Sequence, residues 1–185
     1  MLRRIVEPAD AGSTALAELK AWLGITRDAE DDLLAQLLQS SVAMCEAFIG
    51  RAPLSQLVEE RVPVIAGSYT LKSRPVASFS IAETVAQSGI RNAVDPGLFE
   101  AEIRTDGRLD FRLLREVEGQ AVAVRVRVGI AGSWDEIPTP LRQGIIRLCA
   151  YYYRDRDRTV GSKLSAPPPA SVSALWQPWR EMRLA

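Results

Sequence analysis

Apolar side chains recur every three or four residues in three stretches of the chain, the spacing that one face of an α-helix requires. The strongest stretch follows the acidic residues at Asp28–Asp32 and ends at Gly50, a residue that commonly terminates helices. A second stretch covers Ala15–Leu23, and a third begins at Pro138, since proline fits the first turn of a helix. We expect a helix at each place.

Between Leu57 and Ile130 the pattern alternates with a period of two, which is typical of half-buried strands. Valine alternates with alanine or arginine up to Val128. Two further alternating runs flank Asp106-Gly107, a hairpin turn signal. The region predicts a three-stranded antiparallel meander. Its strands cover Phe99–Ile103, Leu109–Leu113 and Ala121–Val128, with weaker strands before it near Val58–Val64, Tyr69–Leu71 and Phe79–Val85.

These patterns predict an α+β protein. We expect a helical bundle core, made of three long or medium helices plus a C-terminal segment, with an inserted antiparallel β-meander. Residues 1–56 would form the N-terminal helical part of the core and residues 57–130 the β-sheet insertion. Residues 131–161 would supply the remaining core helix, and residues 162–185 a Pro-rich linker, extended over residues 162–173, and a partner-binding tail.

The charge is balanced over the whole chain and uneven along it. Lys and Arg together number 23, as do Asp and Glu, so the protein has no net attraction for nucleic acid. The region 27–50 is acidic, and the region 142–185 is basic. Such complementary surfaces suit contacts between copies, so we expect a subunit interface at Asp28, Asp31, Asp32, Arg154, Arg156 and Arg158. Alternating charges like those at 154–158 are also typical of a solvated, salt-bridged surface.

Candidate chemistry for catalysis is sparse. The chain has no histidine, which removes the commonest general base and metal ligand. Cys45 and Cys149 lie about a hundred residues apart within helical apolar patterns, so we expect two buried core residues. Neighbouring acids at Glu30, Asp31 and Asp32 suit the start of a helix better than a metal site. We therefore expect a protein without cofactor, metal or catalytic residues, which is not an enzyme.

No apolar run approaches the ~20 residues that a membrane span needs, and the first residues do not resemble a signal peptide. We expect a cytoplasmic chain with no membrane partner.

The C-terminal tail has the clearest functional pattern. Apolar and basic side chains follow three consecutive prolines, and such a segment either docks on its own core or binds a partner. Tryptophan and arginine are favoured interface residues, which supports the second interpretation. The expected partner-binding residues are Leu175, Trp176, Trp179, Arg180, Met182 and Arg183.

The order in which these segments follow one another along the chain is a further signal. Ala15–Leu23, the acidic residues and the long helix ending in Phe48-Ile49-Gly50-Arg51 come first. The valine-rich strand, Gly129–Gly132, Ile137–Gln143 and a helix ending in Tyr153–Arg156 come later, and Leu175–Leu184 closes the chain. This succession resembles the head–tail connector (adaptor) proteins of tailed phages. The Arg- and Ala-rich composition would also suit the equivalent adaptor of a gene transfer agent, a phage-like particle encoded in a bacterial genome.

The resemblance implies a structural subunit that forms a ring, expected to be dodecameric, under the portal protein. It implies that the ring extends the DNA channel and docks the next neck or tail protein, a stopper or terminator. The tail residues would bind the portal, and DNA would pass through the lumen without specific binding. The chain would be cytoplasmic before assembly and would then lie in the neck of a virion or phage-like particle.

Three alternatives stay open at this point. Another neck or tail-completion protein would share the ring-forming logic. A DNA-binding packaging or regulatory module would need a basic recognition helix, which the N-terminal helices lack. An enzyme with a carboxylate-held metal is the third. Small connectors also have only a short segment between their second and last helices, whereas this chain carries a substantial sheet there.

Overall fold

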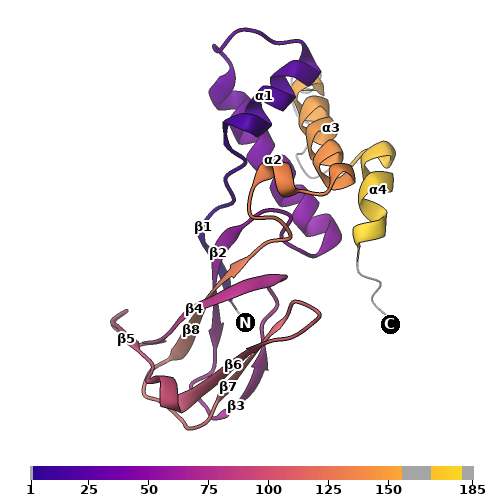
Figure 1. Cartoon of the computed structure of the whole chain (residues 1–185). Coiled ribbons are helices and arrows are strands. Elements are labelled where there is room, and N and C mark those ends of the chain that lie inside the picture. The colour runs from indigo at the N-terminus through magenta and orange to yellow at the C-terminus, as the bar shows by residue number, and fades with distance from the viewer. Residues whose placement is uncertain (1, 156–167, 181–185) are drawn as a thin grey trace. The chain divides into compact units, whose positions relative to one another are not determined.

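The computed structural model describes residues 2–155 and 168–180 (Figure 1). The chain divides into two compact units, each built from two separate segments. Met1–Pro8 and Ser55–Ile130 form the β unit, and Ala9–Leu54 and Ala131–Ala185 form the helical unit. The backbone therefore passes between the units at three points.

The helical unit contains all three helices that the sequence predicts, and a fourth. Within its described residues they are α1 (Gly12–Leu23), α2 (Asp31–Ile49), α3 (Thr139–Asp155) and α4 (Ala170–Trp176), with 3-10 turns η2 (Trp134–Glu136) and η3 (Gln177–Trp179). Both α1 and α2 end where a glycine adopts the left-handed backbone, Gly24 at φ +72° and Gly50 at φ +73°. That conformation lets the terminal N–H groups bond back to the last turn, so these glycines end the helices as expected.

The core of the helical unit lies between α2 and α3, which pack along one another (Figure 1). The inward side chains are almost completely buried, and each buried leucine or isoleucine contributes about 1.5–3 kcal/mol. They are Leu34, Leu38, Cys45 and Ile49 on α2, Leu141, Ile145, Leu148 and Cys149 on α3, and Leu19 on α1. Both cysteines are buried and free, which confirms the prediction made for them.

The C-terminal segment departs from the predicted linker. The sequence favoured an extended linker over residues 162–173, but α4 already begins at Ala170. Val172 is buried and gives this short helix an apolar contact. The small residues around Val172 do not indicate a helix in the sequence. The linker prediction is therefore wrong for residues 170–173, and residues 162–167 lie outside the described residues.

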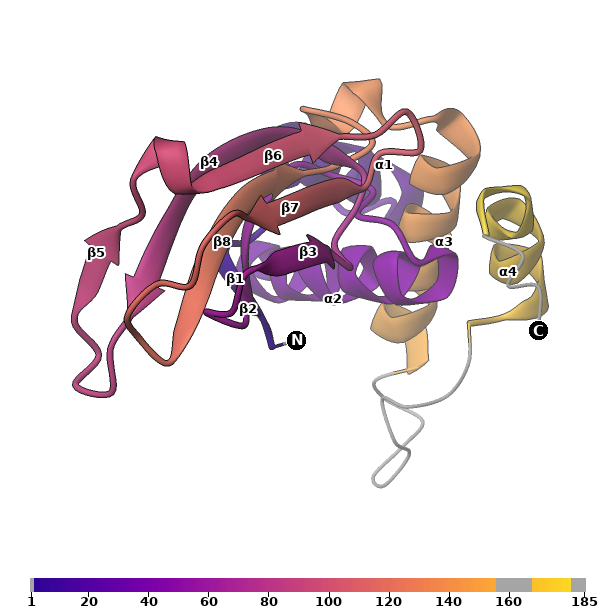
Figure 2. The same cartoon turned by 90° about the horizontal axis from the view of Figure 1, so that it is seen from below.

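The β unit consists of two antiparallel sheets. The strands are β1 (Arg3–Glu7), β2 (Gln56–Val62), β3 (Gly67–Thr70), β4 (Val76–Val85), β5 (Arg91–Ala93), β6 (Phe99–Ile103), β7 (Leu109–Leu113) and β8 (Ala121–Val128). One sheet has the order β1-β2-β8-β4-β5, and the other has the order β3-β7-β6. Figure 2 shows β3, β7 and β6 side by side.

The two sheets pack through aromatic side chains. Phe79 of β4 meets Phe99 of β6 with ring centroids 5.6 Å apart, and Phe99 stacks on Phe111 of β7 at 5.2 Å. The even-numbered valines of β8, Val122 to Val128, are fully buried, whereas Arg125 and Arg127 on its other face reach solvent. The alternation read from the sequence thus has a physical origin, because one face of β8 lies in the core.

The predicted meander is wrong in its pairing. β8 does not follow β7 in a sheet but inserts between β2 and β4, while β7 pairs with β3 and β6. β8 is the central strand of the larger sheet, since β2 pairs with one of its edges and β4 with the other. The antiparallel, mixed α and β character of the fold is confirmed.

A network of charges around one buried carboxylate joins four strands of the larger sheet. Glu59 of β2 is 2% exposed and accepts hydrogen bonds from Arg91 of β5, at 2.6 and 3.0 Å, and from Arg125 of β8, at 3.1 Å. Arg125 also pairs with Glu83 of β4 at 3.1 Å. Arg91 is the main cause that lowers the pKa of Glu59. The buried carboxylate stays ionised and ties non-adjacent strands together.

Candidate functional site

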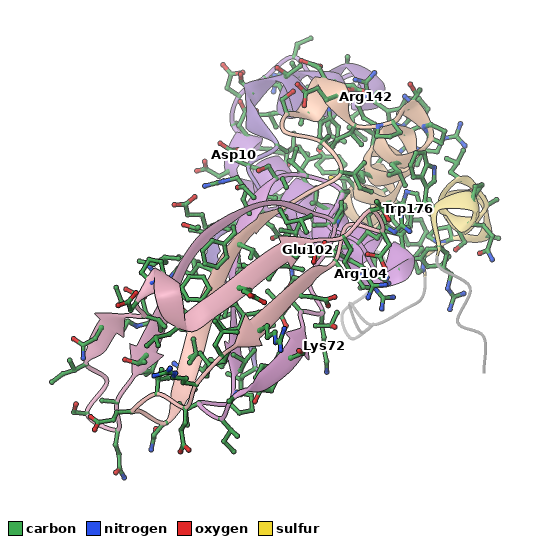
Figure 3. All side chains as sticks on the ribbon, turned by 60° about the horizontal axis from the view of Figure 1, so that its bottom comes forward. Asp10, Lys72, Glu102, Arg104, Arg142 and Trp176 are labelled. Atoms are coloured by element: carbon green, nitrogen blue, oxygen red, sulfur yellow. The ribbon has the colours of Figure 1, made fainter. Side chains whose placement is uncertain are left out.

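The C-terminal segment docks on α3 and α2 of its own helical unit. Trp176 is completely buried, and its indole N–H donates to the carbonyl oxygen of Leu141 at 3.3 Å (Figure 3). Its ring lies 5.7 Å from the ring of Phe48. The indole passes so close to Gly144 that only a residue without a side chain fits there. Among the expected partner-binding residues, Trp176 is therefore an internal anchor.

The neighbouring tail residues remain accessible. Leu175 and Trp179 are half-buried and Arg180 is exposed. The Arg180 guanidinium stands 5.4 Å from the centre of the Phe48 ring, a cation–π distance. Met182 and Arg183 lie outside the described residues. The segment thus presents one aromatic and one basic side chain outward while Trp176 holds it to the unit.

The acidic start of α2 is a compact charged surface. Lys20 of α1 reaches across to Asp28 at 2.6 Å and to Asp31 at 2.8 Å. The hydrogen bond with Lys20 lowers the pKa of Asp28, and the same contact raises the pKa of the Lys20 ammonium. Asp32 is exposed, and the Asp28 side chain is 86% exposed. Local pairing with Lys20 therefore neutralises part of the negative charge predicted for this surface.

The basic end of α3 lies at the same end of the helical unit as these acids. Tyr153, near the end of α3, donates a hydrogen bond from its hydroxyl to Glu30, just before α2. Arg154 is the next residue and is exposed. Arg156 and Arg158 lie outside the described residues. The structure thus brings Asp28–Asp32 and Arg154 to one end of the unit, which the sequence did not reveal.

A groove of about 460 Å³ beside Arg154 was not anticipated. Trp22 and Tyr151 line it and are each 45% exposed, together with Arg147, Pro169 and Val172. The Arg147 guanidinium stands 5.8 Å from the centre of the Trp22 ring. Exposed aromatics beside arginines suit the binding of another protein chain. The signal available in the sequence was Trp22, at a position that the helical pattern leaves on the rim of the apolar face.

The described residues contain no arrangement suited to catalysis by a metal. No group of three or more Cys, Asp or Glu residues among them could hold a metal ion. No helix in the described part of the chain is long and apolar enough to cross a membrane.

Comparisons with known proteins gave a family match and several structural matches. The family model of phage gp6-like head-tail connector proteins matches residues 13–78. The resemblance to head–tail connector proteins is confirmed. No curated protein matches the sequence significantly.

The fold of the full chain has counterparts among solved structures. It is similar to a chain of the structure "Neck of empty GTA particle computed with C6 symmetry", with a TM-score of 0.77, 23% identity and coverage of 100% of this chain and 98% of that chain. The "Neck of native GTA particle computed with C12 symmetry" gives 0.74 and 22% with the same coverage. A third match, "Virion of native gene transfer agent (GTA) particle", gives 0.71 and 23%. The sheets between α2 and α3, unexpected for small connectors, therefore have a counterpart in these neck chains.

Proposed function

We propose that this chain is a structural subunit of a head–tail connector, in the neck of a gene transfer agent or a similar phage-like particle. The similarity to chains of GTA necks over the full length carries this proposal. The matching model of the head-tail connector family over residues 13–78 supports it.

The proposed assembly is a ring of copies of this chain. The symmetry named for the related necks supports a closed ring, with twelve copies as the expected size. A ring subunit needs two different, complementary surfaces, since a head-to-tail contact closes when its rotation divides the circle. The acidic residues Asp28, Asp31 and Asp32 and the arginines 154, 156 and 158 are our candidates for one such contact.

The proposed partner on the head side is the portal protein, bound through the C-terminal segment. Leu175, Trp179 and Arg180 would contact the portal together with Met182 and Arg183, and Trp176 would hold the segment in place. The next neck or tail protein, a stopper or terminator, would dock on the ring. DNA would pass through the lumen without specific binding, which a chain without net charge supports.

A pull-down with the portal protein encoded beside this chain tests the proposal. Full-length chain should retain the portal, and a chain that stops after Ser165 should not. Trp179→Ala combined with Arg180→Ala should weaken retention at least about tenfold, because both side chains are favoured interface residues. Gln177→Ala, an exposed change in the same segment, is the matched control.

Each other outcome has its own meaning. Equal binding by the full and truncated chains would move the portal contact away from the tail. Absence of binding by either, with salt-sensitive binding of duplex DNA, would favour the DNA-binding module instead. Absence of both activities, with retention of a different neck component, would favour another neck or tail-completion protein.

A further inference from the structure

The two sheets of the β unit have four edge strands, of which β1 and β6 are the longest, with five residues each. The larger sheet ends at β1, and the smaller sheet ends at β6. Every residue of β1 is exposed, and in β6 only Phe99 is partly buried. An open edge offers a row of backbone N–H and C=O groups to any strand that can pair with it. These edges are therefore the places where a further strand would add.

The two edges carry opposite charges. β1 contributes Arg3 and Arg4 beside Glu7, which pairs with Arg127. β6 contributes Glu102 and also Glu100, which stands 3.6 Å from Arg112. Each edge also exposes apolar side chains, with Ile5 47% and Ile103 42% exposed. An antiparallel pairing with Arg4 opposite Glu102 sets Ile5 opposite Ala101. Arg4 is then also diagonal to Glu100 on the same face, within reach of a long side chain.

Glu102 has a specific reason to attract a cation from outside. It stands directly opposite Asp110 in the ladder with β7, and like charges in this position destabilise a sheet. Asp110 already accepts a hydrogen bond from Thr70 at 2.6 Å and pairs with Arg104 at 3.5 Å. An arginine arriving on the free side of β6 would offset the repulsion between the two carboxylates.

The remaining edges fit β1 less well. β3 forms the other edge of the smaller sheet, and Gly67–Thr70 carries no charge. β5 is three residues long, and its Arg91 is already held by Glu59 and Glu83. Of the four open edges, β6 alone combines carboxylates with exposed apolar side chains opposite the pattern of β1.

We propose that β1 of one copy pairs with β6 of the next copy, so that β units join edge to edge between subunits. The two edges differ, so the contact is head-to-tail and repeats from copy to copy until the ring closes. This inference rests on the proposed ring and assigns one of its subunit contacts to the β unit. It adds backbone hydrogen bonds to the side-chain contacts proposed for the helical unit.

Cross-linking in assembled particles tests the pairing. Two full-length chains, one with Ile5→Cys and one with Ala101→Cys, are co-expressed in a host that makes the particles and lacks its own copy. A short bismaleimide should join them into a dimer, since the native thiols at Cys45 and Cys149 are buried. Ser68→Cys on β3, used in place of Ala101→Cys, is the matched control and should give no dimer.

A charge exchange supplies the second measurement. Arg4→Glu alone and Glu102→Arg alone should each lower the amount of chain in purified particles about tenfold, and both changes in one chain should restore it. Circular dichroism melting of each purified variant verifies folding. If wild-type chain enters particles, but no dimer forms and both single variants enter normally, the pairing is refuted while the proposed function stands. If wild-type chain does not enter particles at all, the proposed function fails, and the pairing with it.

Discussion

The indole of Trp176 occupies the space that a side chain at Gly144 of α3 would fill. A Cβ atom on Gly144 of α3 would stand 2.1 Å from the indole nitrogen of Trp176, far inside van der Waals contact. The missing side chain is what allows the indole to reach the carbonyl oxygen of Leu141. A glycine in the middle of a helix costs about 1 kcal/mol relative to alanine, so this position gives up helix stability for the docking of α4.

Gly144→Ala should therefore release the C-terminal segment even though alanine favours helices. We expect a net loss of about 1–3 kcal/mol in the free energy of unfolding, as for other overpacked cores. Hydrogen exchange of residues 170–180 should accelerate strongly. Trp176→Ala should produce the same exchange pattern with a loss of about 3–5 kcal/mol, and Gln177→Ala should change neither quantity. Unchanged protection of α4 in Gly144→Ala would show that the indole does not hold the segment.

Removing the buried carboxylate of Glu59 should be costly. Glu59→Gln leaves Arg91 and Arg125 facing a neutral amide, and losing one partner of a buried pair costs up to about 3–5 kcal/mol. Because both arginines are partly exposed, we expect about 2–3 kcal/mol, measured by urea unfolding. Glu7→Gln breaks the exposed pair with Arg127 and should cost less than about 1 kcal/mol. Equal losses for the two variants would contradict the structural role assigned to burial.

The same carboxylate should make stability depend on pH in a defined direction. Hydrogen bonding from Arg91 holds the pKa of Glu59 below its ordinary value of 4.5. A lowered pKa stabilises the folded state at pH values above the unfolded pKa, and this contribution is lost as the pH falls through the folded value. The difference in unfolding free energy between wild type and Glu59→Gln should stay constant from pH 7 to about pH 5.5 and shrink below pH 4.5. A difference that grows on acidification would refute this assignment.

The two thiols should be inert in the folded protein. Burial raises the pKa of Cys149 to about 12 and that of Cys45 further still, and only the thiolate reacts. Maleimide labelling at pH 8 should leave native protein unmodified and should modify both residues in urea. Labelling of a single residue without denaturant would reveal local opening of α2 or α3.

The sequence was informative where a local period reflects a buried face. The helices α1, α2 and α3 and the strands β7 and β8 each carry one buried apolar face that produced the pattern, whereas the apolar face of β6 is mostly exposed. β1 was missed because all five of its residues are exposed and its pairing with β2 spans more than fifty residues. No local signal records such a contact.

The candidate site, too, could be predicted from the sequence only in part. The tail was recognisable from its composition, yet whether Trp176 points outward or inward depends on Gly144, which lies in another helix. In the sequence Gly144 is merely a poor helix former between Gln143 and Ile145. Likewise, the charges at Asp28 and Arg154 were visible, but only the bond between Tyr153 and Glu30 places them at one end of the unit.

The backbone passes three times between the two units, and this limits the order in which the units can fold during synthesis on the ribosome. β1 can pair only after β2 has been synthesised, and β2 can pair with β8 only after β8 has been synthesised. α2 likewise lacks its main apolar partner until α3 has left the ribosome. The β unit can fold completely only after the first helices of the helical unit have been translated, and the helical unit only after the whole β unit has been translated. A translation product that stops before β8 therefore leaves apolar surface exposed in both units, because β2 and α2 each lack a partner.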